Sequence, residues 1–224
     1  MSDEPDATDF LYPMVDGTEE AGDVDELLAD LSASAAGKAE ISAALRRDSL
    51  VAFDAQLDAA AAAMAERFEV GGRLFTCGNG GSATDAEGVA ALFSLPPAGT
   101  RQLAARSLVA DVSILTALSN DIGFDAVFSR QLIAHGREAD MVMGFSTSGN
   151  SANVIAAFER AADIGMLTIG FAGYEGGAMA ACDALGHCLV VRSDSVHRIQ
   201  EAQSAAAHEL WARITRRLDE RSAA

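Results

Sequence analysis

Twice in this chain a short apolar run ends in a cluster of small polar residues, and a pattern with helical spacing follows. In the second instance the apolar run that begins at Met141 stops at Phe145, and six small residues lead to Ser151. Val154 and Phe158 then recur at helical spacing. The first turn of a helix offers unpaired N–H groups and a favourable dipole to an anion. A solvated, capped turn has the same composition, so this stretch alone leaves both interpretations open.

The first instance, Leu74-Phe-Thr-Cys-Gly-Asn-Gly-Gly-Ser82, repeats the same order of strand, turn and helix. Its glycines let a backbone approach a ligand without a Cβ in the way. No Lys follows Gly81, so this is not a Walker loop, and the glycine spacing does not fit the dinucleotide fingerprint. Two anion-type turns in one short chain predict a small, hydroxylated and phosphorylated ligand.

Strand and helix patterns alternate after Gly71-Gly72, which predicts an α/β fold. We expect a three-layer αβα sandwich with a five-stranded parallel sheet, covered on both faces. Ligands of such sheets bind beyond the carboxyl ends of the strands, where both turns fall. The expected strands are 73–77, 104–109, 140–145, 166–171 and 185–191. The expected helices are 82–93, 111–118, 124–135, 152–164, a short one after Gly176-Gly177, and one from 195 to about 218.

The residues before the first strand are helical in pattern. Residues 24–68 predict two helices with a bend near Arg47-Asp48, and they are too long for a simple lead-in. Such helices often supply subunit contacts, with packing onto their own sheet as the alternative. Residues 1–22 are acidic and interrupted by proline and glycine, so we expect a flexible tail followed by one domain over 23–224.

The net charge of −17 is concentrated at the N-terminus. Residues 1–30 hold eleven acidic and no basic residues, and the remainder holds 22 acidic against 16 basic residues. An acidic surface argues against direct nucleic-acid binding. No apolar run reaches the length of a membrane span, and the N-terminal residues do not resemble a signal peptide, so we expect a cytoplasmic protein. Three cysteines, Cys77, Cys182 and Cys188, lack metal-ligand spacing and predict reduced, packed thiols.

Several short segments, in order along the chain, resemble the phosphoheptose isomerase family, whose sugar isomerase (SIS) domains act on sedoheptulose 7-phosphate. The resemblance extends from about Leu74 to Trp211. The segments that carry it are Gly78-Asn-Gly-Gly-Ser82, Ser119-Asn-Asp121, Phe128-Ser-Arg130, Ser146-Thr-Ser-Gly-Asn-Ser151, Gly176-Gly177 and Arg198-Ile-Gln-Glu201.

The resemblance implies a division of labour among the turn residues. Asn79, Gly80 and Gly81 match contacts to the sugar, and Asn120 and Asp121 match contacts to its hydroxyl groups that often cross a subunit interface. The phosphate cradle corresponds to Ser146, Thr147, Ser148 and Ser151, with Ser82 close by. Family members are typically homotetramers whose N-terminal helices pack together, so a homo-oligomer is expected.

The resemblance is incomplete at the family's zinc site. The family places a His and a Glu, four residues apart, on the helix after the first glycine turn, and a Gln and a His on the last helix. Here Gln200 and His208 match the second pair, but Gly88 and Leu92 stand where the first pair belongs. We therefore expect no zinc and no other cofactor.

The catalytic candidates that remain are His208 as base and Gln200, with Glu201 or Asp85 assisting. The family's proton transfer uses the missing Glu together with the last-helix His. Glu87 does not replace it, because its side chain lies about 100° around the helix from position 88 and about 140° from position 92.

Two functions stay open. One is ketose–aldose isomerisation of sedoheptulose 7-phosphate or a related phosphosugar, which the retained Gln200 and His208 favour. The alternative is a non-catalytic binding or regulatory scaffold, resembling the replication-initiator-associating protein of bacteria, which Gly88 and Leu92 favour. Intact phosphate turns fit both, and we favour the isomerase.

Overall fold

The computed structural model describes residues 24–223 and divides at Ile41/Ser42 into two units. The predicted acidic tail, residues 1–22, lies outside the described part, so it stays a prediction, as does the single domain over 23–224. Helix α1 runs from Val24 to Ala52. In the first unit its side chains Leu27, Leu28 and Leu31 are each at least half exposed.

The second unit contains the predicted α/β sandwich. Its sheet has five strands in the order β2-β1-β3-β4-β5, and every neighbouring pair is parallel. All five carboxyl ends therefore lie at one edge of the sheet, as predicted. The strands are β1 (Leu74–Gly78), β2 (Ala105–Ser107), β3 (Met141–Ser146), β4 (Leu167–Gly173) and β5 (His187–Val191).

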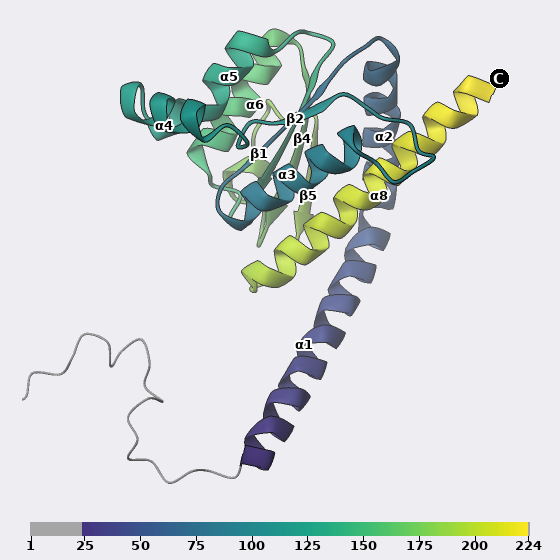
Figure 1. Ribbon diagram of the computed structural model, residues 1–224, viewed down its shortest axis with the longest axis vertical. Coiled ribbons are helices and arrows are strands. Elements are labelled where there is room, and N and C mark those ends of the chain that lie inside the picture. Colours follow the sequence, from purple (N-terminus) through teal and green to yellow (C-terminus); the bar gives the residue numbers. More distant parts are fainter. Residues whose placement is uncertain (1–23, 224) are drawn as a thin grey trace, which may run out of the picture. The chain divides into compact units, whose positions relative to one another are not determined.

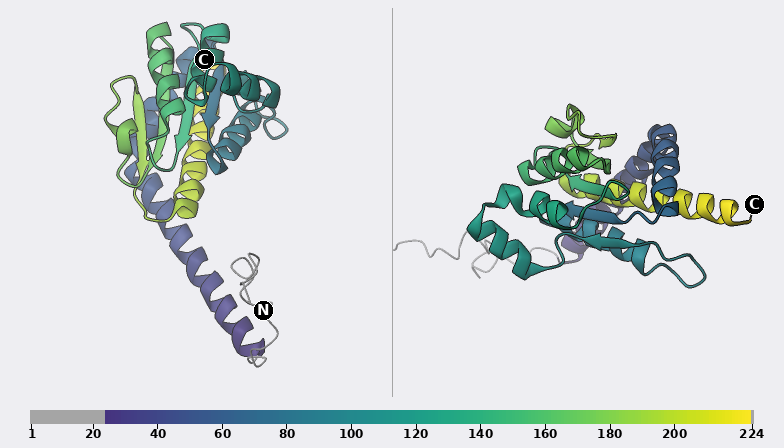
Figure 2. Two further views of the ribbon diagram at one scale, coloured as in Figure 1. Left: turned by 90° about the vertical axis from the view of Figure 1, so that its left-hand side faces the viewer. Right: turned by 90° about the horizontal axis from the view of Figure 1, so that it is seen from above.

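Helices cover both faces of this sheet (Figures 1 and 2). On one face, α2 (Asp54–Glu69), α3 (Gly81–Ser94) and α8 (Val196–Ala223) pack on alternate strand residues such as Phe145 and Phe171, whose rings stack 5.0 Å apart. On the other face, α5 (Val127–His135) and α6 (Ala152–Ile164) enclose Phe75 and Val142. Because both faces of the strands are buried, the strands read in the sequence as continuous apolar runs.

The strand order reverses between β1 and β3. From β1 the chain moves outward to the edge strand β2, and then returns to the other side of β1 to form β3. Helix α3 leaves β1 toward one face, and α6 leaves β3 toward the other. Open parallel sheets bind their ligands at such a reversal, and here it lies between the two small-residue turns.

Some element boundaries differ from the prediction. The break between α1 and α2 falls at the buried residue Phe53 and not near Arg47-Asp48. No proline or glycine marks this break in the sequence, so the prediction misplaced it. Strand β2 has three residues instead of the expected six, and α8 continues to Ala223. The remaining described helices are α4 (Val112–Asp121), the 3-10 turn η1 (Phe124–Ala126) and α7 (Gly177–Ala180). Within residues 24–223, no helix is both long and apolar enough to cross a membrane.

Candidate functional site

Three serine hydroxyls converge at the carboxyl end of β3. Ser146 Oγ lies 2.8 Å from Ser151 Oγ and 3.4 Å from Ser148 Oγ. Ser146 is buried, Ser148 is exposed, and Ser151 is the N-cap residue of α6. Thr147 lies between them and is half-buried. The turn therefore combines hydroxyl groups with the first N–H groups of a 13-residue helix, a combination suited to phosphate.

The loop after β4 fixes the shape of this turn. The Asn150 side-chain oxygen accepts a 2.8 Å hydrogen bond from Ala178 N, and Met179 N donates to Gly149 O at 2.9 Å. Gly149 has φ +66°, and a Cβ added there would lie 2.0 Å from Gly176 O. The two loops are thus in backbone contact, with no room for a side chain between them.

The glycine turn after β1 is joined to the same region through an amide pair. Asn79 Nδ2 donates to Asn153 Oδ1 at 2.8 Å, and Asn153 Nδ2 donates to Asn79 Oδ1 at 2.9 Å. Ser82 is buried in the first turn of α3, and Gly80 takes a φ of +56°. The Asn79 amide, predicted as a sugar contact, keeps one N–H group besides its backbone groups for that purpose.

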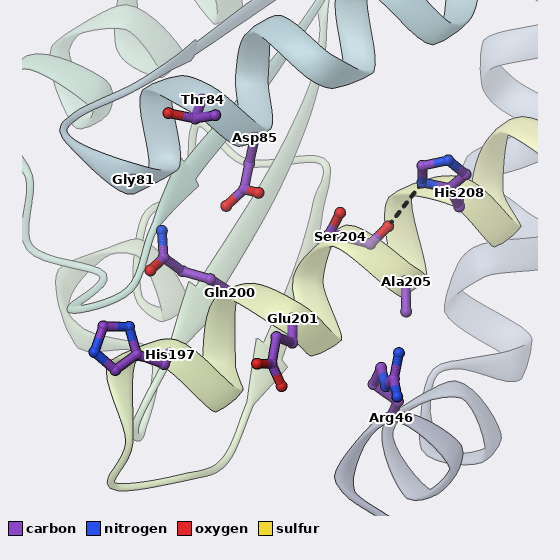
Figure 3. Close-up of a pocket in the computed structure, with 10 residues that line it drawn as sticks. All are labelled: Arg46, Gly81, Thr84, Asp85, His197, Gln200, Glu201, Ser204, Ala205 and His208. Carbon is purple, nitrogen blue, oxygen red and sulfur yellow. Dashed lines mark hydrogen bonds between the residues drawn. The ribbon is translucent and has the colours of Figure 1, made fainter. Parts of the chain in front are cut away.

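A cavity of about 650 Å³ opens between α3 and α8 (Figure 3). Gln200 packs so closely on the glycine turn that a Cβ on Gly81 would lie 2.1 Å from Gln200 Nε2. The lining residues come from the start of α3, from α8 and from α1; they are Gly81, Thr84, Asp85, His197, Gln200, Glu201, Ser204, Ala205, His208 and Arg46.

The exposed His208 ring is oriented by its own helix. His208 Nδ1 lies 3.3 Å from Ser204 O, so this nitrogen carries the proton that it donates, and Nε2 is left as the acceptor. A neutral imidazole in this tautomer can take up a proton through Nε2. The role of base for His208 stays a prediction.

The two carboxyl groups in the cavity differ in their partners. Glu201 accepts hydrogen bonds from Ser42 Oγ and, at 2.6 Å, from Arg198 Nη1. Burial raises the pKa of Asp85, and a hydrogen bond from Gln200 opposes this effect. Asp85 Oδ2 is buried and has no hydrogen-bond partner among the described residues.

Other predicted site residues lie outside this cavity. Asn120 and Asp121 end helix α4, where both are exposed and Asn120 Nδ2 donates to Asp121 Oδ1 at 2.9 Å. The serine turn after β3 is also absent from the cavity's lining residues.

The structure adds five lining residues that were not predicted from the sequence: Arg46, Thr84, His197, Ser204 and Ala205. Ser204 lies midway between Gln200 and His208 on one helical face, so its spacing could have found it. The other four gave no such signal.

Comparisons with known proteins agree with the resemblance. Residues 39–173 match the family described as SIS domain. The phosphoheptose isomerase of Roseiflexus sp. (strain RS-1) is 48% identical over 156 residues, which are 69% of this chain and 78% of the relative. The chain belongs to the phosphoheptose isomerase family. Its relative from Campylobacter jejuni subsp. jejuni serotype O:6 is 45% identical over 157 residues, which are 69% of this chain and 83% of that protein. The structure of phosphoheptose isomerase from Neisseria gonorrhoeae superposes with a TM-score of 0.76 at 37% identity, covering 82% of this chain and 98% of that one.

The zinc site implied for phosphoheptose isomerases does not fit the residues present. Gly88 and Leu92 line a second cavity, of about 440 Å³, that shares Asp85 and His208 with the first. A Cβ on Gly88 would meet no atom within 4 Å, so the position is open but carries no donor. Across residues 24–223, no three His, Cys, Asp or Glu side chains gather into a group that could hold a metal ion.

Proposed function

We propose that this protein interconverts a phosphorylated ketose and its aldose, with sedoheptulose 7-phosphate as the first candidate substrate. The observation that carries the proposal is the serine cluster at the end of β3, tied to the glycine turn of β1 by the Asn79–Asn153 pair. Membership of the phosphoheptose isomerase family supports the same substrate class.

The phosphate group is assigned to the turn from Ser146 to Ser151. Hydrogen bonds from Ser148 and Ser151 to a charged oxygen are stronger than bonds between neutral groups, and the N-terminus of α6 adds a favourable dipole. Ser146 is buried beneath them and orients Ser151 through their 2.8 Å contact. The phosphate would thus be held by groups that need not move to receive it.

The reacting carbons are assigned to the cavity between α3 and α8. Isomerisation moves a proton between adjacent carbons through an enediol, so a base must reach the carbon acid. His208 Nε2 is free to accept that proton, and Gln200 is placed to donate a hydrogen bond to a sugar oxygen. No step is assigned to a metal ion, because the donor set does not fit one.

The test is sedoheptulose 7-phosphate incubated with purified protein in deuterated water and followed by NMR. We expect aldose to form and solvent deuterium to enter at the reacting carbon, both abolished by His208→Ala. That variant should keep sugar-phosphate affinity within about tenfold, equivalent to about 1.4 kcal/mol. The absence of aldose and exchange with several ketose phosphates would overturn the proposal.

A second candidate, a non-catalytic sugar-phosphate-binding scaffold, is favoured by one observation. Gly88 and Leu92 leave the face of α3 without the family's metal and base groups. Tight binding of sugar phosphate without exchange in the same experiment would select this function.

We also propose a homo-oligomer, with a tetramer as the expected state. The first unit exposes three leucines within five consecutive residues of α1, namely Leu27, Leu28 and Leu31. They offer an apolar surface to another copy of the chain. Light scattering at micromolar concentration tests this assembly, and a monomer would contradict it.

A further inference from the structure

Asp85 is the carboxyl group of the candidate site that no cation of residues 24–223 neutralises. The hydrogen bond that it receives within this range comes from the neutral Gln200 amide, and its Oδ2 atom is buried without a partner among the same residues. The other carboxyl group of the cavity, Glu201, is already engaged by Arg198 and Ser42. A buried polar oxygen left unpaired destabilises a fold, so its presence calls for a role.

The position of Asp85 on α3 indicates what that role is. It precedes Gly88 by three residues and Leu92 by seven, so the three Cβ directions fall within about 60° of one another. Asp85 therefore shares the helical face from which the family's metal ligands are missing. It also lines both cavities, together with His208 on the opposite helix.

Figure 3 shows the Asp85 side chain directed from α3 toward α8, between Gln200 and Ser204. A sugar lying between the helices would have His208 on one side and this carboxyl group on another. The enediol reaction needs two kinds of group, one at the carbons and one that neutralises charge on the oxygens. His208 provides the group at the carbons, and the group at the oxygens has to come from another residue.

We propose, building on the proposed function, that Asp85 is a catalytic residue that exchanges protons with the two substrate oxygens while His208 serves the carbons. Starting from the ketose, His208 Nε2 removes a proton from C1, and the C–H electron pair forms the C1=C2 bond. The carbonyl pair moves to O2, which takes the proton of the Asp85 carboxyl group. The Asp85 carboxylate then accepts the proton of the C1 hydroxyl group, C1=O forms, and the C1=C2 pair takes the proton of His208 at C2.

The cycle leaves both residues as they began, with C1 oxidised and C2 reduced within one molecule. No external oxidant or reductant is needed. Protonation of O2 prevents a full negative charge from developing there, which is the task that a Lewis-acidic metal performs in metal-dependent isomerases. The carboxyl group thus takes over that task on a helix that carries no metal ligand.

The test compares Asp85→Asn with Glu87→Gln, a matched control on an exposed carboxylate two residues away. Asparagine still hydrogen-bonds to O2 but cannot pass a proton between the oxygens. We expect kcat for sedoheptulose 7-phosphate to fall at least 100-fold in Asp85→Asn with KM within threefold, and both constants to stay within threefold in Glu87→Gln. The kcat of Asp85→Glu, which keeps a carboxyl group, should exceed the kcat of Asp85→Asn by at least tenfold.

The outcomes separate this inference from the proposed function. An active wild type with Asp85→Asn within threefold of its kcat overturns the inference alone. A rise in KM with unchanged kcat assigns Asp85 to binding and also overturns it. A wild type that binds sugar phosphate without turnover overturns the proposed function, and the inference with it. Should Asp85→Asn fail to fold, as seen in its thermal melt, a folded Asp85→Ser variant with kcat within threefold of the wild type would overturn the inference.

Discussion

Asn79 and Asn153, 74 residues apart in the sequence, join the two small-residue turns through reciprocal side-chain hydrogen bonds of 2.8 and 2.9 Å. Asn153 is buried, so either residue cut back to alanine leaves the other amide without a partner. We expect each single alanine variant to lose about 1–3 kcal/mol of unfolding free energy. The double variant should lose less than the sum of the two, as measured by urea denaturation. Fully additive losses would show that the pair is not coupled.

The serine turn should carry most of the selectivity for phosphate. Ser148→Ala combined with Ser151→Ala removes two hydroxyl donors to a charged group, so binding of sedoheptulose 7-phosphate should weaken by about 1–3 kcal/mol. Calorimetry measures this against Ser222→Ala, a control at the far end of α8. Equal affinity of the wild type for the sugar and the sugar phosphate would contradict the assignment of the phosphate group to this turn.

Gln203 should be a residue whose replacement stabilises the protein. It is fully buried on α8, and neither its nitrogen nor its oxygen has a hydrogen-bond partner among the described residues. Gln203→Met keeps the shape and removes the unpaired amide, so the unfolding free energy should rise by about 1–3 kcal/mol.

Gln131→Met is the matched control for that change. The buried Gln131 differs from Gln203 in its nitrogen, which donates to Leu108 O and Val127 O at 2.9 and 3.1 Å, although its Oε1 also lacks a partner among the described residues. Loss of these two hydrogen bonds should destabilise the fold. Thermal or urea denaturation measures the stability of both variants. A destabilised Gln203→Met would mean that the Gln203 amide has hydrogen-bond partners in solution.

Asp140 should give the fold part of its sensitivity to acid. It is buried beside β3 and accepts bonds from Arg73 Nη2 at 2.7 Å and Arg137 Nη2 at 3.2 Å. Burial alone would raise its pKa, but these hydrogen bonds outweigh burial and lower the pKa from 3.8 to about 2. Because the folded value is the lower one, the stabilisation is complete above about pH 4 and is lost as the pH falls toward 2.

Asp140→Asn should therefore lower the unfolding free energy at pH 7 by about 1–3 kcal/mol and flatten its decline between pH 4 and 2. Asp163→Asn, which breaks an exposed pair with Arg160, should change it by less than about 1 kcal/mol. Urea titrations across this pH range measure both. An undiminished acid response in Asp140→Asn would assign the effect to other carboxyl groups.

Zinc content tests the interpretation of the helix face at Gly88. The purified protein should hold substoichiometric zinc, and a chelator should leave its thermal melt unchanged, because Gln200 and His208 alone make a poor site. Gly88→His with Leu92→Glu supplies two more ligands into open space and should bind one zinc per subunit. Glu87→His with Ala91→Glu, the same spacing on an exposed face, should not. One zinc in the wild type would contradict the argument.

The sheet could be predicted because its strands are apolar on both faces and end in small residues, as at Phe145 and Ser146. Helix α6 was predicted to the residue for a related reason. Ser151 occupies its N-cap position without a capping side-chain hydrogen bond, and Gly165 ends it in the left-handed region. Local sequence therefore determined most boundaries.

Contacts between distant residues were beyond such reasoning. Nothing near Ser42 indicates that it bonds with Glu201, 159 residues later. The Asn79–Asn153 pair is hidden in the same way. Motifs thus predicted the candidate site, whereas the hydrogen-bond partners of its carboxyl groups depend on packing that only the three-dimensional structure reveals.

The glycine-to-backbone contact between the loops after β3 and β4 has a consequence for divergence within this family. A Cβ on Gly149 would lie 2.0 Å from Gly176 O, and a Cβ on Gly177 would lie 2.5 Å from Ser148 O, so a substitution at either one reshapes the serine turn. The shape of the serine turn therefore depends on the loop after β4. The loop after β4 is thereby tied to the shape of its neighbour, whereas a Cβ on Gly88 of α3 would meet no atom within 4 Å.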